Sequence, residues 1–199
     1  FYLHPSVFTP DAQKLRDVGF NPDEPYLLVR FVAFNASHDI GIKVMSDEEK
    51  IALVNRLSKY GRVYVSSEGP VPDELKDKLL KTPYHLIHHM LAFAQLVFSE
   101  GATIASEAAV LGVHALYVNT IQSGSTREQS ERYGLLYCFH DPDERFRQAA
   151  DKAVELLETP HLVEMGQAKR RKLLEEKVDI NGYFMQEMDR LAKVGRKGK

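Results

Sequence analysis

The residues with the clearest chemical potential lie in one stretch, Leu96 to Asn119, which reads LVFSEGATIASEAAVLGVHALYVN. A short apolar run ends at Ser99, and Gly101 follows in a turn where glycine lets backbone approach a ligand closely. A small-residue helix is expected from about Ala102 to Leu111, and its first amides have no partner inside the helix. These N–H groups and the positive end of the helix dipole suit an anion, above all a phosphate. The amides belong to Ala102, Thr103 and Ile104.

Glu107 lies four residues after Thr103, one helical turn deeper and on the same face, roughly 6 Å along the axis. A carboxylate at this place can accept hydrogen bonds from the hydroxyls of a sugar that is linked to the phosphate. The alternative is a helix that binds nothing, with Glu107 in solvent, because most strand-turn-helix units bind no ligand. The local pattern by itself favours this alternative.

Strands and helices alternate at the spacing of βαβ units, which predicts an α/β fold with a parallel sheet and helices on both faces. Strands are expected at Tyr26 to Phe34, Arg62 to Ser67, Tyr84 to Ile87, Leu96 to Phe98, Ala115 to Val118 and Leu135 to Phe139. Capping signals predict three helices besides the one that follows Gly101: one at the capping box Ser46 to Glu49, one after Asp141-Pro142-Asp143, and one at Ile180 to Val194 with Asp179 as its cap. Three more helices are expected at Pro72 to Leu80, at His88 to Ala94 and at His161 to Lys177. The polar segment Gln122 to Gln129 is expected to be a loop.

In a doubly wound sheet, ligands bind beyond the carboxyl ends of the strands. The loops expected at that edge are Asn35 to Gly41, Ser67 to Pro70, His85 to His89, Ser99 to Thr103 and Asn119 to Thr126. His38 beside Asp39 is a candidate for proton transfer or phosphate contact, which makes the pair a candidate catalytic site. The alternative is a loop histidine with an incidental acidic neighbour.

Two other groups of side chains have spacings seen at functional sites. His85, His88 and His89 resemble part of a metal site, but zinc needs further ligands, so a ligand-facing or packing role is favoured. Cys138 and His140 lie two residues apart at a strand end and are expected to share a face. A buried structural cysteine is the favoured interpretation, because no neighbouring residue type is suited to making a thiolate.

Composition limits the class of protein. The 199 residues with 44% hydrophobic content suit one domain or one domain with appendages. The formal charge of −2 gives no basic excess for nucleic acid. A single cysteine excludes an internal disulfide, and no apolar run approaches the roughly 20 residues of a membrane helix. These features predict a soluble, cytoplasmic protein. The apolar start FYLHP indicates a fragment of a longer protein, and a start produced by processing is the alternative.

Several enzyme classes lose support because their motifs are absent. No G-x-G-x-x-G follows the first strand, which weakens a dinucleotide-binding interpretation, and no G-x-x-x-x-G-K-[ST] is present for a P-loop. The sequence also lacks the G-x-S-x-G of an α/β-hydrolase.

The segment GATIASEAAVLGVHALYV, from Gly101 to Val118, resembles the diphosphate- and ribose-binding helix of GT-B fold enzymes. Peptidoglycan N-acetylglucosaminyltransferases have a Gly-Ala start and a ribose-binding Glu at the separation of Gly101 and Glu107. UDP-N-acetylglucosamine 2-epimerases have a Ser-Asp-Ser-Gly-Gly turn where this chain has Ser99 to Thr103. Most of the chain also resembles an uncharacterised prokaryotic family, a domain of unknown function, through YLHP, LLVRFVAFNASHD and SERYGLLY.

The resemblance implies a Rossmann-like domain, the C-terminal half of a GT-B fold, whose missing N-terminal domain completes the cleft. It implies a leading segment at residues 1–25, a nucleotide-sugar-binding domain at 26–160, and C-terminal helices with a basic tail at 161–199. Ser99 and Gly101 to Ile104 would hold the diphosphate and Glu107 the ribose. The base would face Tyr84, His85 and Leu86, chiefly through backbone. His38 lies where epimerases place a His-Arg motif, but Asp39 follows here.

These observations together predict a domain that binds a nucleotide sugar, with UDP-linked sugars favoured, in a GT-B-type glycosyltransferase or a 2-epimerase-like protein. The helix amides would offset the charge of the departing diphosphate without a metal or another cofactor. A non-catalytic nucleotide-binding or regulatory protein that keeps the fold is the alternative. The sugar, the acceptor and the oligomeric state are left open.

Overall fold

The computed structural model describes residues 2–33, 44–177 and 180–197. Within these ranges the core is one sheet in the strand order β2-β1-β3-β4-β5, with every neighbouring pair parallel. The strands are β1 (Tyr26–Phe31), β2 (Arg62–Ser67), β3 (Leu96–Ser99), β4 (Ala115–Val118) and β5 (Leu136–Phe139). The chain runs outward from β1 to β2 and then returns to the other side of β1. The topological switch point therefore lies between β1 and β3, where open α/β sheets bind ligands.

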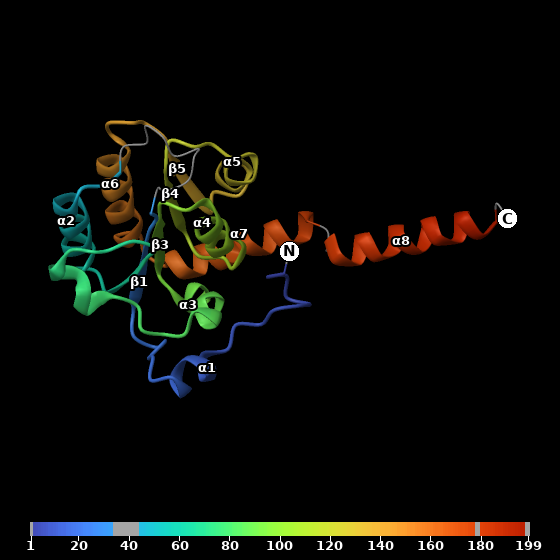
Figure 1. The fold of residues 1–199 in the computed structure, drawn as a ribbon, viewed down its shortest axis with the longest axis horizontal. Coiled ribbons are helices and arrows are strands. Elements are labelled where there is room, and N and C mark those ends of the chain that lie inside the picture. Colours follow the sequence, from blue (N-terminus) through green and yellow to red (C-terminus); the bar gives the residue numbers. More distant parts are fainter. Residues whose placement is uncertain (1, 34–43, 178–179, 198–199) are drawn as a thin grey trace.

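Helices cover both faces of the sheet, as the alternating pattern predicts (Figure 1). One face carries α2 (Asp47–Leu57) and α6 (Arg145–Leu157), while α3 (Ile87–Phe93) and α4 (Ala102–Val110) pack on the other. Successive side chains of β1 alternate between the two cores, since Leu27 faces the α2 side and Leu28 the α3 side. The remaining helices are α1 (Ala12–Asp17), α5 (Gly124–Glu131), α7 (Leu162–Glu176) and α8 (Ile180–Lys197).

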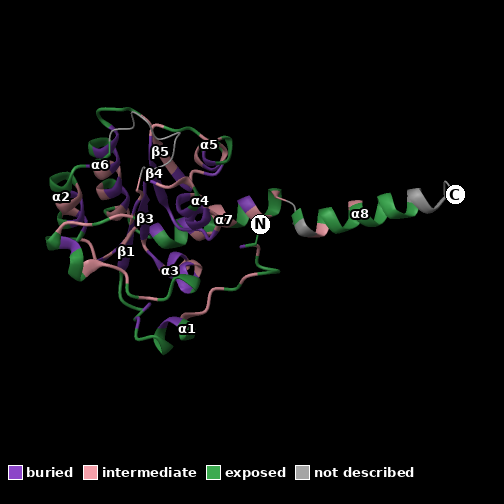
Figure 2. Cartoon of the chain, in the orientation of Figure 1, coloured by how far each residue is buried: buried purple, intermediate pink, exposed green. Residues whose placement is uncertain are grey.

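Both ends of the described domain contribute to these cores (Figure 2). Leu3, Leu15 and Phe20, from the predicted leading segment, are buried on the α3 side of the sheet. Helix α7 crosses the domain, because Leu162 belongs to the α2 side and Leu173 to the α3 side. Residues before β1 and after α6 are thus integral to the packing.

Helix α8 behaves differently from the other helices. It extends away from the sheet in Figure 1, and its large apolar side chains lie in solvent. The exposed set comprises Ile180, Tyr183, Phe184, Met185, Met188 and Leu191. No helix within the described ranges combines the length and apolar character that crossing a bilayer demands. The predicted cap Asp179 lies outside the described residues.

The predicted start of α2 is confirmed. The Ser46 Oγ accepts a hydrogen bond from the Glu49 N–H at 3.2 Å, and the Ser46 N–H donates to Glu49 Oε2 at 2.8 Å. This reciprocal pair is a capping box, which satisfies two backbone donors that a helix start otherwise leaves without partners. The helix ends at Leu57, with Ser58 as its cap, one turn earlier than the glycine at position 61 indicates.

Two predicted elements are wrong. Tyr84–Leu86 is a 3₁₀ helix that leads directly into α3, although its composition favours a strand. The sheet has no place for a strand there, because β3 pairs directly with β1. The polar segment predicted as a loop holds most of α5, in which Thr126 and Gln129 are buried. Tertiary packing against α4 therefore outweighs the low hydrophobicity of this segment.

Two further boundaries differ from the prediction. Helix α6 begins at Arg145, because Asp141 Oδ1 accepts hydrogen bonds from the N–H groups of Asp143 and Glu144 at 2.9 and 2.8 Å and so closes a turn before the helix. The charged segment after β2 forms a 3₁₀ helix at Asp73–Lys78, which is shorter and tighter than the expected helix.

Candidate functional site

A cavity of about 430 Å³ opens at the carboxyl ends of β1 and β2, beside the start of α4. Its volume lies in the range typical of small-molecule sites. The cavity occupies the switch point of the sheet, so the topology places it where a ligand is expected. Its walls are formed by Arg30, Val32, Glu68, Tyr84, Ile87, His88, Gly101, Thr103, Ile104 and Glu107.

The turn before α4 is shaped by Ser99 and Gly101. The buried Ser99 hydroxyl accepts a hydrogen bond from the Gly101 N–H at 3.0 Å and donates one to the Gly101 carbonyl at 2.8 Å. A Cβ atom at Gly101 would approach Val32 Cγ2 at 3.3 Å, so glycine permits close packing of the ends of β1 and β3. Ser99 thus fixes the turn and does not line the cavity, whereas Gly101 does.

The first turn of α4 has no side-chain cap. Gly101 occupies the N-cap position and has no side chain to accept from the helix amides. Thr103 and Ile104 line the cavity, Thr103 from an exposed and Ile104 from a buried position, while Ala102 does not line it. The helix start therefore offers uncapped N–H groups and a positive dipole end next to the cavity, as an anion site requires.

Glu107 lies in the same wall, one turn into α4, and is buried. Its Oε1 accepts a hydrogen bond from the Tyr2 hydroxyl, and its Oε2 lies 3.3 Å from His88 Nε2. Burial is the largest cause that raises the pKa of Tyr2 to about 12, followed by the hydrogen bond to Glu107 and the carboxylate charge. Tyr2 therefore remains a protonated donor throughout the physiological range of pH.

Arg30 brings a positive charge to the cavity from the carboxyl end of β1. Its side chain is only 12% exposed, and its guanidinium pairs with Glu68 at 2.6 Å and donates to Ser66 Oγ at 2.7 Å. These two partners fix the guanidinium plane. Arg30 is not among the residues predicted from the sequence, although a charged residue near the end of the otherwise apolar strand β1 is a signal for it.

The three residues predicted to face the base are not placed alike. Tyr84 lines the cavity with an exposed ring, while His85 is exposed outside it and Leu86 packs in the core. The next turn supplies Ile87 and His88 to the cavity wall. The segment therefore reaches the predicted site, and Tyr84 carries its side-chain contribution.

The three clustered histidines have separate environments. His88 faces Glu107, while the buried His89 accepts a hydrogen bond from the Asp11 N–H at 3.0 Å and contacts the Phe8 ring at 4.9 Å between centroids. Burial lowers the pKa of His89. Among the residues described by the structure, no group of three histidine, cysteine or acidic side chains is arranged to hold a metal ion.

Glu100 supports the site from inside. Its Oε2 accepts from the Val32 N–H at 2.9 Å, and its carbonyl accepts from Asn119 Nδ2 at 3.0 Å, so it joins the ends of β1, β3 and β4. Burial, the largest cause, raises the pKa of Glu100 to about 7. Oε1 is buried without a hydrogen-bond partner in the described chain. This carboxyl group positions the strand ends and does not line the cavity.

The remaining candidates lie elsewhere. His38 and Asp39 fall outside the described residues, so their catalytic role stays a prediction. Cys138 is half-buried, its thiol lies 3.8 Å from the Thr126 carbonyl, and burial raises its pKa, which favours a structural thiol over a thiolate. The ring of His140, the other residue of the predicted pair, contacts the ring of Tyr117.

No family model matches the chain, and no curated protein matches it. Two solved glycosyltransferase structures share its fold. CalG4, the calicheamicin glycosyltransferase, is 22% identical over 84% of this chain and 42% of its own, with a TM-score of 0.53. The spinosyn forosaminyltransferase SpnP is 16% identical over 86% of this chain and 45% of its own, with the same TM-score of 0.53.

The chain has the Rossmann-like fold of GT-B glycosyltransferases. The predicted fold class is therefore confirmed. At these identities the likeness concerns the fold alone, and the chain spans less than half the length of either glycosyltransferase.

Proposed function

We propose that the cavity beside α4 binds the nucleoside diphosphate part of a nucleotide sugar, with UDP-linked sugars favoured. The chain would serve as the nucleotide-binding half of a glycosyltransferase or of a sugar-nucleotide epimerase-like protein. One observation carries the proposal: the uncapped start of α4 and the buried carboxylate of Glu107 line the same cavity, one helical turn apart.

The diphosphate is assigned to the start of α4. Backbone N–H groups of Ala102 to Ile104 and the helix dipole provide positive potential without a bound cation. Arg30 adds a formal charge to the cavity wall, and its contacts with Ser66 and Glu68 hold it in place. The developing charge on a departing diphosphate would be stabilised by groups that are already oriented, which is the main source of catalytic power in such sites.

The ribose is assigned to Glu107 and the base to the Tyr84 side of the cavity. An ionised carboxylate has two oxygens with about four acceptor sites, which matches a pair of vicinal sugar hydroxyls. Tyr84 presents an exposed aromatic ring, and aromatic rings offer a stacking surface to any base. Because the match covers less than half of each glycosyltransferase of similar fold, turnover is assigned to a longer assembly.

Calorimetric titration of UDP into the chain tests this assignment. We expect saturable binding by wild type and a loss of about 10- to 100-fold in affinity for Glu107→Gln, because the hydroxyls lose a charged acceptor. Glu155→Gln is the matched control, since Glu155 lies on α6, on the other face of the sheet, and pairs with Lys152 at 2.6 Å. Wild type that fails to bind UDP would falsify the assignment of the cavity.

A further inference from the structure

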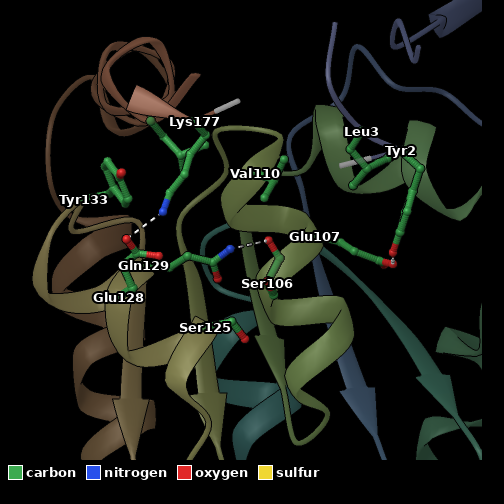
Figure 3. Close-up of a pocket in the computed structure, with 11 residues that line it drawn as sticks. Tyr2, Leu3, Ser106, Glu107, Val110, Ser125, Glu128, Gln129, Tyr133 and Lys177 are labelled. Atoms are coloured by element: carbon green, nitrogen blue, oxygen red, sulfur yellow. Dashed lines mark hydrogen bonds and ion pairs between the residues drawn. The ribbon is translucent and has the colours of Figure 1, made fainter. Parts of the chain in front are cut away.

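The amino-terminal residues make a specific contact with the carboxylate assigned to the ribose. Figure 3 shows the Tyr2 side chain reaching along α4 to Glu107, with Leu3 beside it. Leu3 is buried in the core on the α3 side of the sheet, so it anchors the backbone next to Tyr2. Tyr2 itself remains 53% exposed, so its ring is held mainly by the hydrogen bond and by its contact with the ring of His88, 5.6 Å away between centroids.

Both carboxylate oxygens of Glu107 are engaged in this arrangement. Oε1 accepts from Tyr2 and Oε2 faces His88, and only 11% of the Glu107 side chain is accessible. A ribose must reach this carboxylate in competition with its present partners, because so little of the side chain is accessible. The Tyr2 hydroxyl therefore competes with a ribose hydroxyl for Oε1 and restricts access to it.

Tyr2 is the partner that can leave. His88 belongs to α3, whose residues Met90 and Leu91 are fully buried, and its ring also contacts Phe8. Moving His88 would disturb that packing, whereas Tyr2 needs only a rotation of its own side chain. A second cavity, of about 310 Å³, lies next to Tyr2 between α4, α5 and α7 (Figure 3). Its apolar wall includes Leu3, Val110 and Leu173, which suits a displaced aromatic ring.

We propose that Tyr2 is a latch that occupies the ribose-binding carboxylate in the free protein and is displaced when a nucleotide binds. The inference rests on the proposed function, because it takes Glu107 as the ribose acceptor. It predicts that the described structure is the closed form of the site, and that nucleotide affinity is reduced by the fraction of molecules in that form.

Tyr2→Phe separates the latch from the rest of the site, because it removes the hydroxyl and keeps the ring. We expect its affinity for UDP to rise by about tenfold, the worth of one hydrogen bond to a charged group. Its affinity for inorganic pyrophosphate should not change, since pyrophosphate lacks the ribose. Tyr60→Phe is the control, because Tyr60 donates to Glu158 at 2.7 Å on an exposed surface outside the cavity and should leave both affinities unchanged.

The outcomes distinguish the two proposals. If wild type binds UDP and Tyr2→Phe binds it equally or more weakly, the latch is wrong while the nucleotide site stands. If neither protein binds UDP while both keep the melting temperature of a folded domain, the nucleotide assignment fails and the latch fails with it.

Discussion

The Glu100 carboxylate accepts a hydrogen bond from the backbone N–H of Val32, with 2.9 Å between Oε2 and N. This bond ties the end of β3 to the end of β1 at the base of the candidate site. It also places an ionisable group in the interior, where burial is the largest cause that raises its pKa to about 7. The effect of this buried carboxyl group on the free energy of unfolding can be measured as a function of pH.

Replacing Glu100 by glutamine should change how stability depends on pH. The folded state holds the carboxyl proton more tightly than the unfolded state, so this group's contribution is largest at low pH and is lost as the pH rises from 4.5 to about 7. The loss amounts to at most about 3 kcal/mol. Glutamine keeps an acceptor for Val32 and has no charge to bury.

Denaturant unfolding of wild type and Glu100→Gln at pH 5 and pH 8 checks this prediction. The quantity to compare is the difference in the free energy of unfolding between the two proteins. Burial lowers the pKa of His114 to about 4, so His114 makes both proteins more stable as the pH rises, opposite to the effect of Glu100. We expect the variant to gain stability relative to wild type at pH 8. An equal change with pH in both proteins would contradict the role of Glu100.

Arg30→Gln should weaken pyrophosphate binding. The substitution removes a positive charge that lines the cavity, and we expect a loss of about tenfold in affinity at low salt. Arg56→Gln is the control, because Arg56 pairs with Asp151 at 2.7 Å on the α2–α6 surface. Equal affinities for the two variants by calorimetry would show that Arg30 does not contact the anion.

Gly166→Ala should destabilise the domain strongly. A Cβ atom at Gly166, on α7, would lie 2.2 Å from the carbonyl oxygen of Gly112. The backbone at Gly166 and at Gly112 cannot move apart without disturbing the surrounding packing. We therefore expect a loss of about 2–3 kcal/mol in the free energy of unfolding. A Cβ at Gly124 meets nothing within 4 Å, and Gly124→Ala should change stability by less than about 1 kcal/mol. Urea unfolding of both variants tests whether α7 is packed as closely as described.

Removing α8 should leave the domain intact. Its large apolar side chains are exposed, whereas α7 places Leu162 and Leu173 in the cores. A chain that ends at Lys177 is expected to melt within about 2 °C of the full chain. A fall of more than about 5 °C in calorimetry would show that α8 packs on the domain in solution.

Local signals sufficed for much of the fold. Strands β2 and β4 have the predicted bounds, since their apolar and β-branched runs are flanked by clear turn residues. The capping box at Ser46 also forms as expected. The errors arise where tertiary context decides, since Tyr84–Leu86 has strand-like composition but no neighbouring strand to pair with, and α5 is polar yet packs through Thr126.

The candidate site was predictable only in part. Gly101, Thr103 and Glu107 are close in sequence, so helix periodicity brings them to one face without knowledge of the sheet. Tyr2 contacts Glu107 across 105 positions, and no local pattern encodes that contact. Arg30 and Glu68 meet because β1 and β2 are paired in register, which sequence alone does not fix.

The central claim is that the start of α4 holds the diphosphate. Backbone amide NMR shifts during titration with UDP test it most directly, because they report on individual N–H groups. We predict the largest shift changes at Gly101, Ala102, Thr103 and Ile104, with smaller changes at Glu107 and His88. Saturable binding of UDP whose largest shift changes lie outside α4, or no shift changes at millimolar UDP, would contradict the account.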